Sequence, residues 1–304
     1  MRPFLIAEIS SNHNNSLCRA KEMISVAHQA GFDAVKFQLF KIDQLFSSEI
    51  LSSSKKHRDR RKWELPEEYI PELSKEAHKL DMKFGCTPFY IDAVKELEPL
   101  VDFFKVSSYE ILWHDLMVAC CDTGKPFIFS TGMSTYSEVE EALRVISKCK
   151  SDDITILKCT SKYPSSPKDI NLQSIESLRK MAKKYRKKFK VGLSDHSRSL
   201  AVVLRAIHKY EVSTIELHID LEGKGVEYGP GHCWLPDEIR KLKQLVDDGY
   251  ISDGSVAIGP TVSEQEERLW RADPRDGLRP IYSTRKAFSK KVKKMFLSEN
   301  VTKR

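Results

Sequence analysis

The sequence predicts an α/β fold, specifically a (β/α)8 TIM barrel with a short C-terminal extension, on the basis of three observations. Short apolar, β-branched runs alternate with helix-length amphipathic segments, the runs number eight, and polar side chains gather where they end. This alternation is typical of βαβ units around a parallel sheet. An open doubly wound sheet would show the same local pattern, and the count of eight favours the closed barrel.

The runs and the segments between them define the expected elements. The expected strands are residues 4–9, 34–38, 83–87, 103–107, 127–131, 154–160, 190–194 and 214–219. Helices opened by Ser, Asp or Asn caps are expected between the strands. They include residues 18–30, 91–97, 137–148, 172–187 and 200–209.

Two long loops interrupt this rhythm. Residues 41–66 contain the charged run KKHRDRRK, and residues 220–236 are rich in glycine. Both follow the C-terminal end of a strand, the face on which barrel enzymes build their sites. We expect residues 1–250 to form the barrel. Residues 251–304 are expected to form an extension that packs on the barrel or on a partner subunit.

Composition limits the class of protein. The N-terminus lacks the features of a secretory signal and no apolar window is long enough for a membrane helix, so a cytoplasmic protein is expected. Seven cysteines form no CxxC pair, which argues against a disulfide framework or a zinc ribbon. The net charge is +7, and eight of the twelve residues in 179–190 are Lys or Arg. A solvated helix face explains this run better than nucleic-acid binding does, because few aromatic residues accompany it.

Polar residues collect at the C-terminal ends of the predicted strands, and a barrel places all of these ends around one cavity. Within strands 34–38 and 214–219, Lys36 and Gln38 share one face, as do Glu216 and His218. In chain order the strand ends carry Glu8, Lys36, Gln38, Thr87, Lys105, Ser108, Glu110, Ser130, Thr131, Thr160, Ser161, Tyr163, Ser194, Asp195, His196, Glu216 and His218. Polar groups that face a barrel interior need each other, a metal or a ligand as partners.

Two kinds of site are indicated. Lys36 and Lys105, together with the nearby hydroxyls, are suited to binding a phosphate and a carboxylate, so a small dianionic substrate is expected. His196 and His218 end neighbouring strands and can converge on one divalent ion. His13 and His232 are rival ligands for such an ion.

Several segments in order resemble the sialic acid synthase (N-acetylneuraminate synthase) family. They are AEISSNHNN, VKFQLF, GCTPF, FFKVSSYE, STGM, LKCTSKYP, GLSDHS and ELHID, and the resemblance spans residues 3 to about 235. It implies a transferase that condenses phosphoenolpyruvate with an N-acetylmannosamine-like amino sugar. The product would be a nine-carbon 2-keto-3-deoxy sugar acid, and phosphate would be released. A homodimer is also implied.

The resemblance assigns roles by position. Phosphoenolpyruvate would contact Lys36, Thr87, Lys105, Ser108, Ser130 and Ser194. The sugar would contact Gln38 and Tyr163, with Ser161 at a position where relatives often have Asn. His196 and His218 resemble the ligands of Mn²⁺ or Mg²⁺. Glu8, Glu110 and Glu216 match acidic positions of the family, and proton handling falls to Glu110 and Glu216.

The chain departs from the family pattern in three places. Ser10 and Asn15 stand where glycines are common. Gly231 stands where relatives place an Asp that contacts the acceptor sugar, so the identity of the sugar is open. A complete C-terminal antifreeze-like domain is not expected, and Arg271, Arg275 or Arg279 is predicted to replace the arginine that this domain sends to the partner subunit's site.

Two alternatives stay open. The barrel could condense phosphoenolpyruvate with a phosphorylated aldose, in the manner of deoxyoctulosonate or deoxyheptulosonate phosphate synthases, and KKHRDRRK would then supply a second anion site. It could instead be an inactive barrel that binds nucleic acid or an acidic partner through residues 179–190 and the KKVKK tail. The intact motifs argue against the inactive barrel, and no nucleic-acid or membrane partner is expected.

Overall fold

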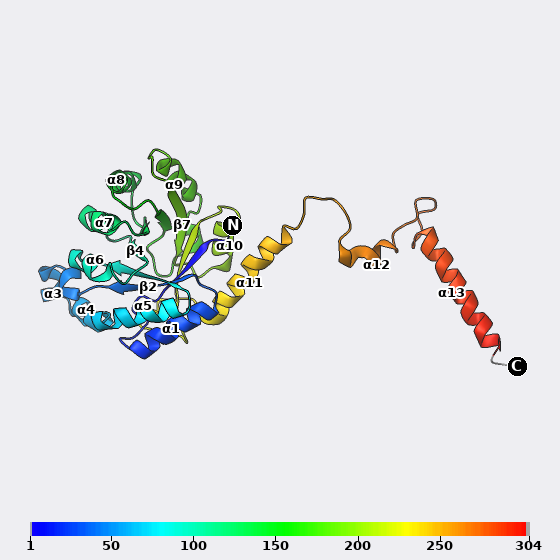
Figure 1. Ribbon diagram of the computed structural model, residues 1–304, viewed down its shortest axis with the longest axis horizontal. Helices are drawn as coiled ribbons and strands as arrows, with labels where there is room; N and C mark the ends of the chain where they lie inside the picture. The colour runs from blue at the N-terminus through cyan, green and yellow to red at the C-terminus, as the bar shows by residue number, and fades with distance from the viewer. Residues whose placement is uncertain (1, 302–304) are drawn as a thin grey trace. The chain divides into compact units, whose positions relative to one another are not determined.

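A computed structural model describes residues 2–301 of the protein. The chain divides into two compact units, Met1–Ile251 and Ser252–Arg304. The first unit is built on a closed barrel in which eight parallel strands pair in chain order, with β8 paired to β1. Helices alternate with the strands and surround the barrel (Figure 1). The predicted (β/α)8 fold is confirmed.

The predicted strands agree with the observed ones to within one residue at each end. The strands are β1 Phe4–Glu8, β2 Ala34–Leu39, β3 Lys83–Pro88, β4 Phe103–Val106, β5 Phe127–Ser130, β6 Ile154–Cys159, β7 Phe189–Asp195 and β8 Thr214–His218. The principal helices of this unit are α1 Leu17–Gln29, α5 Ile70–Lys79, α6 Ile91–Leu97, α7 His114–Cys121, α8 Tyr136–Ile146, α9 Ser174–Ala182, α10 Leu200–His208 and α11 Pro236–Ser252.

The helix predicted for residues 172–187 ends earlier, at Ala182. The Tyr185 hydroxyl donates to the carbonyl of Glu140, and Lys187 donates to carbonyls of Cys149 and Ser151. These contacts join the basic run to the middle of α8 and to the segment between α8 and β6. Several of its side chains therefore hold tertiary structure in addition to facing solvent.

The barrel interior is layered. Ile6, Ala34, Phe103, Ile128 and Leu157 form a buried apolar cluster inside it, while a larger apolar core lies between the strands and the helices. In β1, β2, β4 and β5, the residue two positions beyond each cluster member faces the same side of its strand, and each of these residues is polar. An apolar layer therefore lies beneath a polar layer at the C-terminal ends of the strands.

Two loops shape the C-terminal end of the barrel. The connection after β2 folds into the short helices α2 Ile42–Leu45, α3 Ser48–Ser53 and α4 Lys55–Arg58, followed by the 3-10 turns Asp59–Trp63 and Glu67–Tyr69. Its Trp63 carbonyl accepts a hydrogen bond from Ser11, just beyond β1. The connection after β8 is irregular as far as Pro236.

The second unit contains a 3-10 turn, Val262–Glu264, and the helices α12 Gln265–Arg268 and α13 Tyr282–Val301. Asp273 organises it: its carboxylate pairs with Arg275 and accepts from the Tyr282 amide at 2.6 Å. Among the described residues, no helix combines the length and apolarity needed to cross a membrane.

Candidate active site

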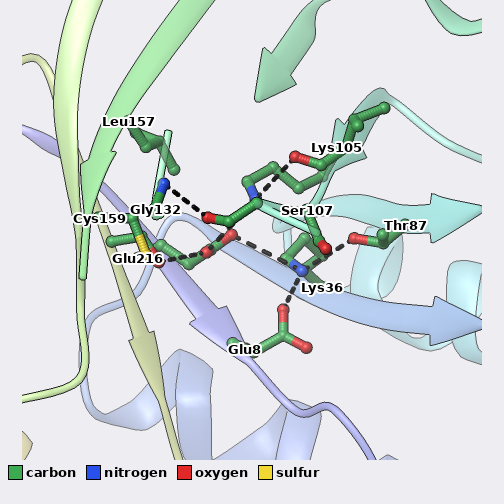
Figure 2. Close-up of polar contacts among 12 residues, drawn as sticks. Glu8, Lys36, Thr87, Lys105, Ser107, Gly132, Leu157, Cys159 and Glu216 are labelled. Atoms are coloured by element: carbon green, nitrogen blue, oxygen red, sulfur yellow. Dashed lines mark hydrogen bonds and ion pairs between the residues drawn. The ribbon is translucent and has the colours of Figure 1, made fainter. Parts of the chain in front are cut away.

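Charged side chains from four strands meet at the C-terminal end of the barrel. Lys36 pairs with Glu8, and its Nζ donates to Thr87 Oγ1 at 3.0 Å (Figure 2). The same Nζ lies 3.6 Å from Glu216 Oε2, and Lys105 Nζ lies 3.8 Å from Glu216 Oε1. The two lysines and two glutamates are each at most 3% exposed. They form one buried network in which positive and negative charges balance.

Neighbouring polar side chains fix the two carboxylates. Gln38 donates to Glu8 Oε1 at 3.0 Å, and the Ser194 hydroxyl donates to Glu216 Oε1 at 2.8 Å. Gln38 follows Lys36 by two residues on β2, so both face inward, as the alternation predicted. The structure thus brings together seven of the predicted site residues, Thr87 included, in a single network.

Burial and the opposite charges decide the ionisation of this network. Burial lowers the pKa of Lys105, and Glu216 offsets only part of that effect. Burial also acts against the charge of Lys36, but Glu216 and Glu8 together raise its pKa above the usual value. Burial alone would raise the pKa of Glu216, and the charges of Lys105 and Lys36 instead hold it at about 2. Lys105 is therefore the cation that an added anion would stabilise most.

Three predicted serines lie around the end of β5. The Gly132 amide donates to Ser108 Oγ at 2.9 Å. A Cβ on Gly132 would lie 2.1 Å from Ser161 Oγ and 2.8 Å from Ser108 Oγ, so only glycine fits beside them. The Ser130 hydroxyl is buried and has no hydrogen-bond partner among the described residues. A buried hydroxyl of this kind is suited to a ligand.

Glu110 has a different environment from Glu8 and Glu216. Its carboxylate accepts a hydrogen bond from Ser107 and pairs with neither buried lysine. Burial raises its pKa, and Ser107 and Lys105 offset part of the shift. The structure therefore places Glu110 near the charged network but outside its direct contacts.

Three imidazoles gather beside the charged network. The rings of His196 and His218 have centroids 5.1 Å apart, and that of His232 lies 4.7 Å from His218 and 6.1 Å from His196. Tyr163 packs against His196 at 4.2 Å and against His232 at 4.9 Å. The ring of His13 packs against Phe37 and makes no ring contact with these three histidines, and its Nδ1 accepts from the Asn15 amide at 3.0 Å. Of the two rival histidines, only His232 therefore joins the predicted pair.

The imidazole cluster contains side chains that could hold a divalent ion. The ring centroids of His196, His218 and His232 lie 4.7–6.1 Å apart, but the group of ligand atoms within 4.8 Å of one another leaves out His196. Burial, together with the charge of His218, lowers the pKa of His232 to about 3, so this ring is neutral and can act as a ligand. Potential ligand atoms of His218, His232 and Cys233 also lie within 4.8 Å of one another.

Sequence reasoning missed one acidic residue in this cluster. Glu227, in the loop after β8, accepts from Ser10 at 2.6 Å, and its Oε2 lies 3.5 Å from His218 Nδ1. The loop returns to the site because Asn12 accepts from the Glu227 amide at 2.8 Å. A Cβ on Gly225 would lie 2.3 Å from the Asn12 side chain, so glycine permits this approach. The glycine-rich loop was the only signal in the sequence.

This geometry is accompanied by similarity to known proteins. The model of the NeuB family matches residues 23–256, which is most of the barrel. The chain belongs to the NeuB family. The predicted family and the predicted enzyme class, a transferase of the N-acetylneuraminate synthase type, are therefore confirmed.

Two curated relatives come from Campylobacter jejuni. An N,N'-diacetyllegionaminic acid synthase is 32% identical over 270 residues, covering 82% of this chain and 78% of that protein. A pseudaminic acid synthase is 30% identical over 98% of this chain and 85% of its own length. The names of the two relatives give different product acids, N,N'-diacetyllegionaminic acid and pseudaminic acid.

A solved structure gives the same fold. The N-acetylneuraminic acid synthetase of Leptospira borgpetersenii, in complex with citrate, superimposes with a TM-score of 0.74 at 29% identity. The match covers 90% of this chain and 93% of that one. The resemblance therefore extends well beyond the motifs from which it was first inferred.

Proposed function

We propose that this NeuB-family enzyme condenses phosphoenolpyruvate with an unphosphorylated, N-acetylmannosamine-like amino sugar. The products are a nine-carbon 2-keto-3-deoxy sugar acid and phosphate. The observation that carries the proposal is the pair of buried lysines, Lys36 and Lys105, that share Glu216 directly beside the imidazole cluster. An anion cradle and an ion site at one end of the barrel suit a reaction between an enol phosphate and an aldehyde.

The anion cradle is assigned to phosphoenolpyruvate. Lys36 and Lys105 neutralise its phosphate and carboxylate, and hydroxyls of Thr87, Ser108, Ser130 and Ser194 donate to its oxygens. The free Ser130 hydroxyl and the incompletely compensated Lys105 support this assignment. Because the lysines are already held by Glu8 and Glu216, little reorganisation is needed when the substrate binds.

The imidazole cluster is assigned to the aldehyde end of the acceptor. His196 and His218 would hold Mn²⁺ or Mg²⁺, which when bound supplies Lewis-acid polarisation of the aldehyde oxygen and helps to position the attacking water. Tyr163 packs on His196 and covers the cluster. The sugar is assigned to contacts with Tyr163, Gln38 and Ser161. Gly231 has φ of +92°, a conformation that favours glycine, so this position contributes no side chain to acceptor recognition.

The glutamates divide the proton transfers. Glu110 has a raised pKa and therefore suits the role of proton donor. Glu216 stays ionised between two lysines, and we assign it the other proton-handling role, beside the water that adds at C2. Glu8 holds Lys36 in its charged form.

The test is phosphate release from phosphoenolpyruvate with Mn²⁺ across a panel of aldoses. The panel holds N-acetylmannosamine, its 2,4-diacetamido relatives, mannose, arabinose 5-phosphate and erythrose 4-phosphate. Release that needs an unphosphorylated amino sugar and stops with EDTA is the expected result. Release only with a phosphosugar would contradict the proposal in favour of the deoxyoctulosonate or deoxyheptulosonate type.

The proposal includes a cytoplasmic homodimer in which an arginine of residues 252–304 completes the partner's sugar site. Arg275 is held by Asp273 and stacks on Tyr282 at 4.1 Å, which presents one guanidinium in a fixed place within its own unit. The KM for the sugar is measured in three variants, Arg271→Ala, Arg275→Ala and Arg279→Ala. At least one of these substitutions should raise the KM. Three unchanged KM values would rule out a role for these arginines in the partner's sugar site.

A further inference from the structure

In both predicted ligand histidines, a hydrogen-bond acceptor lies beside the ring nitrogen Nδ1. His196 Nδ1 lies 2.9 Å from the carbonyl oxygen of Thr160, and His218 Nδ1 lies 3.5 Å from Glu227 Oε2. Both neighbours are hydrogen-bond acceptors. A neutral imidazole carries one N–H and one lone pair, so an acceptor at Nδ1 favours the tautomer that keeps the lone pair on Nε2. Both rings are thereby prepared to bind an ion through Nε2.

Glu227 is held in place from several sides. Its Oε1 accepts from Ser10, its amide donates to Asn12, and its side chain is 22% exposed. Its Oε2 lies between two rings, 3.5 Å from His218 Nδ1 and 3.9 Å from His232 Nε2. Among the described residues, Glu227 is the only acidic side chain within 4 Å of a His218 nitrogen. This carboxylate is therefore placed to set the orientation of His218.

We propose that Glu227 is a positioning residue of the metal site, and this inference rests on the proposed function. His218 Nδ1 has no hydrogen-bond partner among the described residues, and Glu227 Oε2 lies 3.5 Å from it. In the metal-bound enzyme this carboxylate would take the Nδ1–H of His218 and direct Nε2 to the ion, while Ser10 fixes the carboxylate. Histidines that bind metals usually donate their other N–H to a carboxylate or a carbonyl, and loss of that partner weakens metal binding about 10- to 100-fold. Thr160 performs the same task for His196 through its backbone.

A different ion position competes with this one. His218, His232 and Cys233 offer ligand atoms within 4.8 Å of one another, and His232 Nε2 lies 3.6 Å from the Cys233 sulfur. In that arrangement the Cys233 thiol is a ligand, and binding of the ion does not require Glu227 to orient His218. Binding of an ion there would depend on Cys233, whereas the proposed arrangement depends on Glu227.

The experiment measures Mn²⁺ binding to the metal-free enzyme without substrates, using the electron paramagnetic resonance signal of free Mn²⁺. Glu227→Gln keeps the size of the side chain, removes its negative charge and replaces one of its two acceptor oxygens with an amide NH2 that cannot accept a hydrogen bond. Glu222→Gln is the matched control, because Glu222 lies on the same loop but pairs with Arg19. Cys233→Ser tests the competing position. The Kd should rise about 10- to 100-fold in Glu227→Gln, and it should stay within about threefold of wild type in Glu222→Gln and Cys233→Ser.

Two results would overturn the inference. One is a Glu227→Gln Kd within about twofold of wild type, and the other is a rise in Cys233→Ser as large as that in Glu227→Gln. Phosphoenolpyruvate affinity, measured on the same metal-free variants, shows whether the barrel end is intact and should not change. If wild type binds Mn²⁺ and turns over while Glu227→Gln binds normally, only this inference fails. If wild type neither binds Mn²⁺ nor turns over, the proposed function fails with it.

Discussion

The charged network and the imidazole cluster lie side by side at one end of the barrel, yet the chain builds them differently. Glu8, Lys36, Lys105 and Glu216 all lie within strands, and each follows an inward-facing residue by two positions. The imidazole cluster takes His218 from a strand, but its His232 and Glu227 come from the irregular loop after β8. Strand register alone fixes the first region, whereas the second also depends on contacts between loops.

Removal of Lys36 should produce the largest effect. In Lys36→Met, the buried carboxylates of Glu8 and Glu216 lose a counter-ion, which costs about 3–5 kcal/mol of stability. The cradle also loses a donor to phosphoenolpyruvate, so kcat should fall about 10²–10³-fold. Urea unfolding and phosphate release measure the two effects.

A second variant separates charge balance from substrate binding. Glu8→Gln combined with Lys36→Met removes one charge of each sign, and it should recover part of the lost stability but none of the activity. If the double variant were as unstable as Lys36→Met, the loss would come from packing and not from the unpaired carboxylates.

A methyl group at Gly225 should affect only the loop-built region. Its Cβ would lie within 2.5 Å of both Asn12 and Asp220, so Gly225→Ala should displace the loop at a cost of about 1–3 kcal/mol. Mn²⁺ affinity should fall about tenfold as His232 and Glu227 move. Phosphoenolpyruvate affinity should stay the same, because the cradle lies on strands.

The matched control is Gly229→Ala in the same loop. Gly229 has ordinary φ and no heavy atom within 4 Å of an added Cβ, so stability should change by at most about 0.5 kcal/mol. If Gly225→Ala and Gly229→Ala lowered Mn²⁺ affinity equally, the affinity would be sensitive to any change in the loop. It would then not depend specifically on the close approach of Gly225 to Asn12.

The smallest effect concerns a charge remote from both regions. Asp102, just before β4, accepts from the Phe84 amide at 2.8 Å and pairs with His78 and Lys83. Burial would raise its pKa, but these partners hold it below the usual 3.8. Its contribution to stability is therefore present above pH 3.8 and is lost as the pH falls through the lower folded-state pKa.

Asp102→Asn should accordingly cost about 1 kcal/mol at pH 7. The difference from wild type should shrink as the pH falls below about 4, which urea titrations at several pH values would measure. Activity and Mn²⁺ affinity should not change. A stability difference independent of pH would show that the loss does not arise from the ionised carboxylate.

The contrast between the two regions also explains what the sequence could predict. Alternation in VKFQ and ELH placed Lys36, Gln38, Glu216 and His218 inside the barrel, because side-chain direction in a strand depends only on local register. Glu227 was missed because its position depends on Asn12, more than 200 residues away, and on the space that Gly225 leaves. The early end of α9 was missed for a similar reason, since Tyr185 and Lys187 bind distant carbonyls.

We propose that the strand-built cradle binds phosphoenolpyruvate while the imidazole cluster and its ion serve the acceptor. Calorimetric titration of phosphoenolpyruvate into EDTA-treated enzyme, followed by a turnover assay on the same sample, tests this division of roles. Phosphoenolpyruvate should bind about as tightly without metal as with it, and phosphate release should begin only when Mn²⁺ and the amino sugar are added. Loss of phosphoenolpyruvate binding on metal removal, or turnover without metal, would contradict this division of roles.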